Sequence, residues 1–165
     1  SLVGSEMCIR DRVVLTEVNP IRLGQAREAA FIDHALSGTA EGLTDTLHEL
    51  AGGLFDCAVE CSGNQRAATM ALESIKPGAT LTMLAYGSGP QVDSFSFIND
   101  EKRIQGGVFF TPEDFERVIA MMADGRIDIR QYAEIITMDD AQDTFLGLDN
   151  GTKNAQKYVI KITSE

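Results

Sequence analysis

The sequence predicts an α/β fold in which a parallel sheet is covered by helices on both faces. Short apolar runs rich in β-branched residues alternate along the chain with segments whose apolar residues recur at helical spacing. Helical connections of ten or more residues favour parallel strand pairing, because each connection must return the chain to the same end of the sheet. Apolar residues make up 44% of the chain and charged residues 24%, which is typical of a globular domain.

The first half of the chain alternates strictly between the two kinds of segment. Pro20 suits the first turn of a helix, and Gly52-Gly53 ends a later one. The predicted strands are at 13–16, at 34–36 and, buried, at 55–61, where the last one ends at Ser62-Gly63. The first predicted helix begins at Pro20 and has Ile21, Leu23, Ala26, Ala29 and Ala30 on its apolar face. The second predicted helix is marked by Leu43, Leu47 and Leu50.

The second half continues the alternation with longer connections. A helix is predicted over 65–75, and it buries Ala68, Met70, Ala71, Leu72 and Ile75. It is followed by a turn at 76–78, a strand at 80–84, a loop over 86–100 and a strand at 104–110. The last predicted elements are a helix from Pro112 with Phe115, Val118, Ile119 and Met122 inward, a helix near 139–149 and a strand at 158–162.

Charge and cysteine usage exclude several classes of function. The chain has 14 Lys and Arg against 25 Asp and Glu, so its formal net charge is −11. Such an acidic surface repels phosphates, which argues against a nucleic-acid partner and against a basic membrane-binding role. No window approaches the roughly 18 apolar residues that a transmembrane helix needs. Three cysteines do not form a disulfide framework, so we expect a cytoplasmic protein.

The first twelve residues differ from the rest of the chain. SLVGSEMCIRDR has no strand or helix periodicity and no apolar core of a secretory signal. It is similar to translated adapter sequence, so we expect residues 1–12 to be a non-native leader, with a native N-terminal arm as the alternative.

Glu17 is the first candidate for ligand binding. It follows the first predicted strand, and Arg22 lies about one helical turn further on. In doubly wound folds, an acidic residue at the tip of an early strand accepts hydrogen bonds from the adenosine ribose hydroxyls and repels a 2′-phosphate. The alternative is that Glu17 only solvates the end of a strand.

Three other segments lie at the predicted carboxyl ends of strands. They are Glu60-Cys61-Ser62-Gly63, Ala85-Tyr86-Gly87 and Gly107-Val108-Phe109. Glycine allows the backbone to approach a ligand closely, and open α/β sheets bind ligands at this edge. Each segment alone could be an ordinary turn, but four such strand ends point to one crevice.

Catalytic and metal-binding motifs are absent. The sequence contains no G-x-G-x-x-G, no P-loop, no G-x-S-x-G and no H-E-x-x-H. At about 3.3 Å per residue, Cys57 and Cys61 lie about 13 Å apart along a strand, too far to share one zinc ion. His34 and His48 have no metal-binding partner at suitable spacing. We therefore assign no catalytic residue and no metal ligand.

A set of ordered segments supports a family resemblance. The segments are VVLTEVNPIRLGQAREA, FDCAVECSG, KPGATLTMLAYG, RIQGGVFF, DFERVIAMMADGRIDI, EIITMDDAQDTF and QKYVIKI. Together they resemble the cofactor-binding half of the zinc-type, medium-chain alcohol dehydrogenases, which include polyol and threonine dehydrogenases. The resemblance covers essentially all of residues 13–165, which would make them one partial NAD-binding domain.

The resemblance implies roles for three charged residues. Glu17 matches the acidic residue that binds the adenosine ribose diol, which implies NAD rather than NADP as the cofactor. Arg22 matches a basic position that often contacts the same ribose. Lys157 matches a basic position near the pyrophosphate.

It also implies backbone contacts at the other three strand ends. Cys61, Ser62 and Gly63 match a strand end beside the adenosine and nicotinamide riboses. Ala85 and Tyr86 match a segment that reaches the nicotinamide carboxamide, although Ala85 stands where the family usually has glycine. Gly107, Val108 and Phe109 match a segment whose backbone holds the nicotinamide amide.

Two parts of the family have no counterpart in the sequence. One is the catalytic domain with the zinc ligands, so zinc is expected only there. The other is the first strand and its glycine-rich turn, so the expected fold is a Rossmann-like doubly wound parallel sheet that is truncated. Since the missing strand is central, the strands at 13–16 and 56–61 would each lack a partner on one side and expose unpaired edges, unless residues 1–12 fill the gap.

The resemblance implies the cofactor-binding portion of an NAD-linked, zinc-dependent alcohol or polyol dehydrogenase. The intact enzyme would oxidise a small-molecule alcohol, whereas this polypeptide alone would neither bind NAD tightly nor catalyse. The strand from Gln105 to Phe110 is a candidate edge for a homo-oligomer. A nucleotide-binding methyltransferase-like domain and a non-catalytic α/β binding module are the alternatives.

Overall fold

The computed structural model describes residues 12–153, 155 and 157–162. The chain divides into two compact units, with the boundary between Phe109 and Phe110. The expected leader, residues 1–12, lies outside the described residues except for Arg12.

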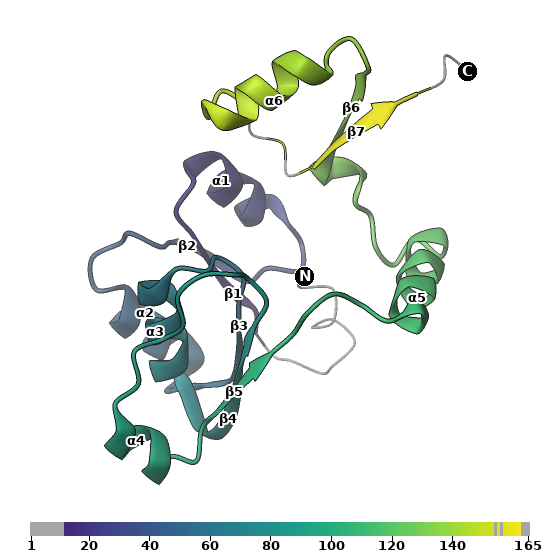
Figure 1. The fold of residues 1–165 in the computed structure, drawn as a ribbon. Helices are drawn as coiled ribbons and strands as arrows, with labels where there is room; N and C mark the ends of the chain where they lie inside the picture. Colours follow the sequence, from purple (N-terminus) through teal and green to yellow (C-terminus); the bar gives the residue numbers. More distant parts are fainter. Residues whose placement is uncertain (1–11, 154, 156, 163–165) are drawn as a thin grey trace. The chain divides into compact units, whose positions relative to one another are not determined.

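The N-terminal unit alternates strands and helices, as the sequence predicts (Figure 1). Side-chain caps begin three of its helices: Asn19 Oδ1 accepts hydrogen bonds from the backbone of Ile21 and Arg22, Asn64 caps a later helix in the same way, and Asp93 accepts from Ser96 N at the start of a third. The elements are β1 (Val14–Glu17), α1 (Pro20–Glu28), β2 (His34–Ser37), α2 (Leu43–Ala51), β3 (Phe55–Glu60), α3 (Gln65–Glu73), β4 (Ile75–Met83), α4 (Ser94–Asn99) and β5 (Arg103–Gly106).

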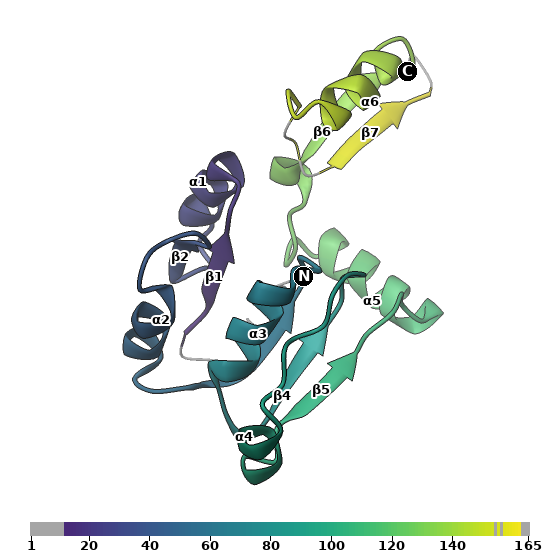
Figure 2. The same ribbon diagram turned by 60° about the vertical axis from the view of Figure 1, so that its left-hand side comes forward.

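The strands of this unit form two parallel sheets instead of one. β1 pairs with β2, and β3, β4 and β5 pair in that order (Figure 2). Within the described residues, β1 has β2 as its one strand partner and β3 has β4. That no further strand pairs with either edge stays a prediction, because residues 1–11 lie outside the described residues.

The core of the N-terminal unit lies between α3 and the three-stranded sheet. Leu72, Ile75 and Leu81 are buried there, and Phe55 and Phe97 pack against them. This core holds β3 and β4 in register, so it also positions the loops that follow them.

Several predicted boundaries are wrong. The helix predicted over 65–75 ends at Glu73, so Ile75 is buried in β4 and not on the helix. The predicted turn at 76–78 lies inside β4, which begins at Ile75, and the register shifts between Phe55↔Ile75 and Cys57↔Thr80 to accommodate it. The predicted loop at 86–100 contains α4, which Asp93 caps. The strand predicted to reach Phe110 ends at Gly106, and Phe109, three residues further on, has a left-handed φ of 55° that extended pairing does not allow.

The C-terminal unit is a helix followed by a parallel β–α–β arrangement. It contains α5 (Pro112–Ala123), a 3-10 helix (Arg130–Tyr132), β6 (Ala133–Thr137), α6 (Ala141–Asp149) and β7 (Lys157–Lys161). β6 pairs with β7 in parallel. The predicted helix from Pro112, the predicted helix near 139–149 and the predicted last strand are present as α5, α6 and β7. β6 was not predicted as a strand.

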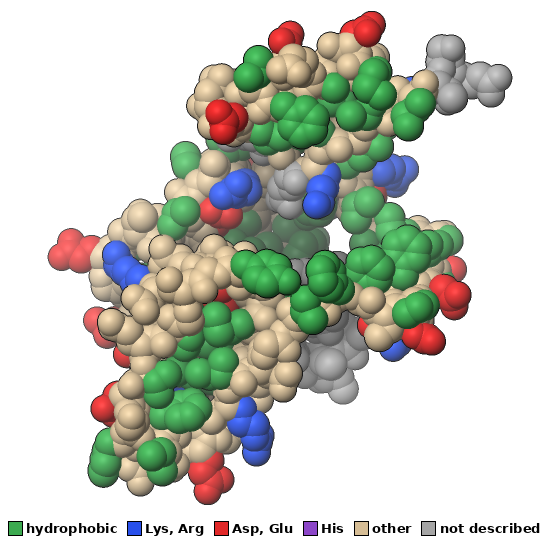
Figure 3. Space-filling model, in the orientation of Figure 1, with side chains coloured by type: hydrophobic (Ala, Val, Ile, Leu, Met, Phe, Trp, Pro, Cys, Tyr) green, Lys and Arg blue, Asp and Glu red, His purple; other side chains and the backbone are tan. Residues whose placement is uncertain are grey.

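Helix α5 begins as predicted, but its apolar face is not buried. Thr111 and Asp114 form a reciprocal capping box, and Pro112 occupies the first turn. Phe115, Val118 and Ile119 are exposed instead of inward, and hydrophobic side chains gather over α5 in Figure 3. Helical spacing identifies an apolar face but not what covers it, which is why the prediction of burial fails.

None of the helices in the described ranges combines the length and the apolar character that crossing a membrane requires.

Candidate functional site

Glu17 ends β1, and its carboxylate is held by its own loop. Oε1 accepts hydrogen bonds from the backbone N–H groups of Val18 and Asn19, both at 2.8 Å. Oε2 accepts from Arg22 Nε at 2.9 Å, and Arg22 Nη2 lies 3.3 Å from Oε1. The first turn of α1, fixed by the Asn19 cap, brings Arg22 back to the strand end. The structure thus joins the two charged residues that the sequence singled out here.

This environment keeps Glu17 ionised. Partial burial raises the pKa of the carboxyl, but the hydrogen bond and charge of Arg22 and the backbone donors of Asn19 and Val18 outweigh it, so the pKa lies below its ordinary value. The side chain is still 22% exposed, so a ligand hydroxyl can reach it. Such a hydroxyl would compete with Arg22 for the carboxylate oxygens.

Glu60 ends β3 and is a buried counterpart of Glu17. Its side chain is only 4% exposed. Its Oε1 accepts hydrogen bonds from the Ser62 backbone at 2.7 Å and from the Ser62 hydroxyl, and Gly63 N lies 3.1 Å from both carboxylate oxygens. The sequence analysis included Glu60 in this candidate segment but gave a ligand-binding role only to Cys61, Ser62 and Gly63, so the role of Glu60 was missed. The signal was a carboxylate that ends an apolar strand directly before a serine and a glycine.

The loops that follow β3 and β4 touch backbone to backbone. Gly63 O accepts a hydrogen bond from Ser88 N at 3.1 Å. A Cβ added to Gly63 would lie 2.4 Å from the Tyr86 carbonyl oxygen, and one added to Gly87 would lie 2.1 Å from the Gly63 carbonyl oxygen. Gly63 also has a φ of +68°, which disfavours other residues. Both glycines are therefore required by the close approach of these loops.

The ends of β4 and β5 line a common groove. Gly107 N donates to Met83 O at 2.9 Å, and a Cβ on Gly107 would meet Leu84 Cδ2 at 2.7 Å. The groove has a volume of about 560 Å³ and is lined by Met83, Leu84, Ala85, Tyr86, Gly106, Gly107, Val108 and Phe109. Five residues predicted from the last two strand ends therefore lie together around one cavity.

The groove is apolar and open. The rings of Tyr86 and Phe109 are each 88% exposed, and Val108 is also exposed. The Gly106 carbonyl oxygen accepts a hydrogen bond from the Gln105 side chain at 2.8 Å, and Val108, next along the groove, is exposed. Apolar walls with accessible backbone donors and acceptors suit a flat ring that carries an amide.

Lys157 is the one predicted site residue that belongs to the C-terminal unit. It is the first residue of β7, exposed and in register with Ala133, and it belongs to the C-terminal unit. The other ten predicted residues belong to the N-terminal unit.

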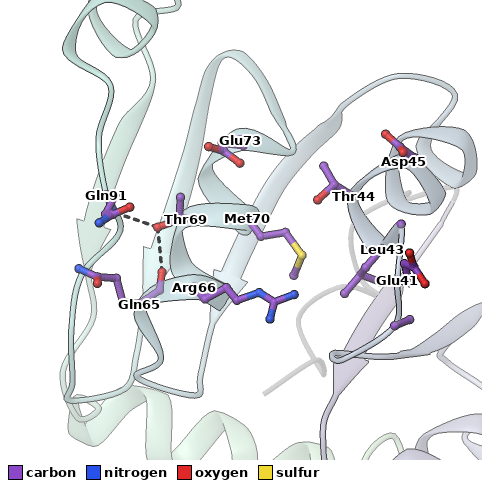
Figure 4. Close-up of a pocket in the computed structure, with 12 residues that line it drawn as sticks. Glu41, Leu43, Thr44, Asp45, Gln65, Arg66, Thr69, Met70, Glu73 and Gln91 are labelled. Carbon is purple, nitrogen blue, oxygen red and sulfur yellow. Dashed lines mark hydrogen bonds between the residues drawn. The ribbon is translucent and has the colours of Figure 1, made fainter.

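A second cavity of about 620 Å³ lies between α3 and the loop that precedes α2 (Figure 4). Arg66 and Met70 extend from α3 towards this loop, and Thr69 is fixed by hydrogen bonds with Gln65 O and Gln91 N, both at 2.8 Å. Three carboxylates also line it: Glu41, Asp45 and Glu73. None of the predicted site residues lines this cavity.

The described residues offer no metal centre. No group of three or more His, Cys, Asp and Glu residues in these ranges is arranged to hold a metal ion. Zinc therefore has no fitting donor set in the described part of the chain.

Comparison with known proteins decides the family. Residues 8–124 match the family model described as zinc-binding dehydrogenase. The chain belongs to this family. The resemblance inferred from the ordered segments is thereby confirmed.

Relatives of this zinc-binding dehydrogenase chain are longer proteins. It is 24% identical over 153 residues to (R,R)-butanediol dehydrogenase from Neisseria gonorrhoeae (strain ATCC 700825 / FA 1090), covering 90% of this chain and 43% of that protein. The chain thus spans less than half the length of this relative.

Solved structures of dehydrogenases share the fold. Benzyl alcohol dehydrogenase from Acinetobacter calcoaceticus superposes with a TM-score of 0.85 at 17% identity, over 98% of this chain and 46% of that chain. A zinc-binding dehydrogenase from Sinorhizobium meliloti 1021, bound to NADP, superposes with a TM-score of 0.72 at 22% identity, over 87% of this chain and 43% of that chain. The prediction of a Rossmann-like α/β fold is confirmed.

Proposed function

We propose that this chain is the cofactor-binding portion of an NAD-linked, zinc-type alcohol dehydrogenase. The observation that carries the proposal is the convergence of the loops after β3, β4 and β5. Their backbones touch at Gly63 and Gly87, and two of them line one apolar groove. Loops at the carboxyl ends of parallel strands are where α/β sheets bind nucleotides.

In this proposal the groove takes the nicotinamide end of the cofactor. The backbone of Gly107 and Val108 holds the carboxamide, and Tyr86 and Phe109 bound the ring. The bound cofactor supplies the hydride acceptor, and the protein supplies orientation and excludes water. The absence of a Cβ at Gly107 leaves room for the Leu84 side chain, which forms part of the groove wall.

The adenosine end lies at Glu17 and Arg22. The ionised Glu17 accepts hydrogen bonds from the ribose diol and repels a 2′-phosphate, which favours NAD. Arg22 is the nearest cation, and arginine near this position accommodates the phosphate of NADP in other dehydrogenases. The NADP-bound structure from Sinorhizobium meliloti is the reason to test both cofactors.

The alcohol substrate and the zinc ion belong to the remainder of the protein in this proposal. The described residues contain no zinc donor set, so zinc ligands are expected in a region that the chain does not span. The relative from Neisseria gonorrhoeae is named for butanediol, so a small secondary alcohol is the substrate class that we propose. We expect the protein to act in the cytoplasm.

Recovery of the upstream coding sequence tests the proposal directly. We expect segments that carry Cys and His zinc ligands, followed by a strand and G-x-G-x-x-G shortly before Val13. The methyltransferase alternative predicts the glycine-rich strand without the zinc-ligand segments, and a complete α/β binding module predicts neither. A fluorescence titration of the complete protein with NADH and NADPH then measures both affinities, and failure to bind either one would contradict the proposed function.

A further inference from the structure

Glu60 is a buried charge for which the proposed function has no use. Among the described residues it is the one charged side chain that is buried. Burial of a carboxylate is costly unless hydrogen bonds replace its hydration. All the hydrogen bonds to its carboxylate come from Ser62 and Gly63, the second and third residues after it.

These hydrogen bonds connect Glu60 to the apolar groove in two steps. The carboxylate fixes the Ser62–Gly63 turn, and Gly63 in turn contacts Gly87 and Tyr86 backbone to backbone. The Glu60 carbonyl oxygen also accepts a hydrogen bond from Leu84 N at 2.9 Å. Leu84, Ala85 and Tyr86 form one wall of the groove.

We propose that Glu60 is a positioning residue, which sets the wall of the nicotinamide groove through the Ser62–Gly63 turn. The turn holds Gly63 in the position in which its backbone contacts that of Gly87. Without the carboxylate, the N–H groups of Ser62 and Gly63 would turn to water, and the support for the Tyr86–Gly87 loop would be lost. The ligand named in this proposal rests on the proposed function, whereas the role of Glu60 in the loop does not.

Three variants of the chain separate hydrogen bonding from packing. Glu60→Met keeps the length of the side chain and an apolar fit but removes both acceptors. Glu60→Gln keeps one oxygen, which can still accept from Ser62. Glu49→Gln is the matched control, because Glu49 is exposed on α2.

Amide hydrogen exchange of the ligand-free chain, measured by NMR, reports on the loop directly. We expect about tenfold faster exchange at Ser62, Gly63 and Ser88 in Glu60→Met, a smaller change in Glu60→Gln and none in Glu49→Gln. Unchanged protection in Glu60→Met, or equal loss in the Met and Gln variants, would overturn the proposal. If Glu60→Met failed to fold, Ser62→Ala would replace it, with an expected increase of about threefold at Gly63 and unchanged exchange as the contrary result.

The complete protein then links the loop to the cofactor. In Glu60→Met we expect the KM for NAD to rise about tenfold while the KM for the alcohol stays within about twofold, with partial recovery in Glu60→Gln. A loss of stability alone would not produce this difference between the two substrates. If the wild-type protein bound no NADH, the proposed function would fail, but amide exchange would still decide the role of Glu60. Normal NAD kinetics in Glu60→Met would refute the positioning role itself.

Discussion

Glu17 and Glu60 show how one residue type performs two tasks at equivalent places. Each ends a strand and accepts hydrogen bonds from the N–H groups of the next residues. Glu17 remains partly exposed and pairs with Arg22, so it can exchange partners with a ligand. Glu60 is buried and bound by its own turn, so its contribution is to the shape of the loop.

Replacement of Glu17 is the sharpest test of cofactor choice. In the complete protein, we expect Glu17→Ala to weaken NAD binding about tenfold, because the ribose loses a charged acceptor. NADP binding should weaken less or improve, because a repelling charge is removed and Arg22 is freed. Fluorescence titration with NADH and NADPH measures the ratio, and Glu28→Ala, at an exposed position in α1, is the control. An unchanged ratio would count against the ribose role.

The ion pair of Glu17 also predicts a pH dependence of stability. Because the folded-state pKa lies below its ordinary value of 4.5, the contribution of Glu17 is fully present above pH 4.5 and is lost as the pH falls through the folded-state pKa. Urea unfolding of the chain and of Glu17→Gln should therefore differ at pH 7 and converge under acidic conditions. A difference that persisted at low pH would show that the effect does not come from ionisation.

At the scale of elements, the loops after β3 and β4 depend on glycine for different reasons. Gly63 needs its left-handed backbone as well as space, whereas Gly87 needs space alone. The order of the elements brings these loops together, because parallel neighbours end at the same edge of the sheet. A close approach of this kind cannot be read from either loop separately.

Gly87→Ala should therefore be much more harmful than a nearby glycine substitution. Its Cβ would lie 2.1 Å from the Gly63 carbonyl oxygen, so one loop must move, and we expect a loss of about 1–3 kcal/mol in the free energy of unfolding. Gly89→Ala is the matched control: a Cβ there meets nothing within 4 Å, and we expect a change within about 0.5 kcal/mol. Urea unfolding measures both, and equal effects would contradict the importance of the loop contact.

Local chemistry made some elements predictable and left others hidden. The starts of α1 and α5 follow from Pro20 and Pro112, because proline favours the first turn of a helix. The short helix α4 was missed, since a single turn and a half has no apolar periodicity to detect. The end of β5 at Gly106 was also missed, because the left-handed turn at Phe109 is rare for an aromatic residue.

At the scale of the whole molecule, unpaired strand edges are the main physical consequence of the fold. Within the described residues, β1 and β3 each use one edge for pairing. The N–H and C=O groups along an edge that no other described strand pairs with can form hydrogen bonds with further strands. The exposed apolar side chains of α5 are a second surface through which copies of the chain can associate. Of the segment Gln105–Phe110, predicted as an edge for pairing between subunits, only Gln105 and Gly106 lie in β5, so pairing along this edge stays a prediction.

These edges predict the behaviour of the 165-residue polypeptide in isolation. We expect it to bind NADH weakly and without saturation in the micromolar range, and to self-associate as its concentration rises, because β1 and β3 each have one edge that no other described strand pairs with. Fluorescence titration and sedimentation velocity measure the two properties. Saturable micromolar binding by a monomeric chain would show that no further strand is needed for the site.

The sequence by itself determined the α/β class and most of the elements, and it singled out the four strand ends that we propose for ligand binding. These properties depend on local periodicity, caps and turn residues, which act over a few positions. Only the tertiary structure decided that Arg22 folds back onto Glu17, that Gly63 meets Gly87, and that Glu60 is buried beneath the turn it holds. The contact of Gly63 with Gly87 depends on register and packing between strands distant in the chain, whereas the contacts of Glu17 and Glu60 are local in sequence but depend on the exact backbone geometry of each turn and on the burial around it.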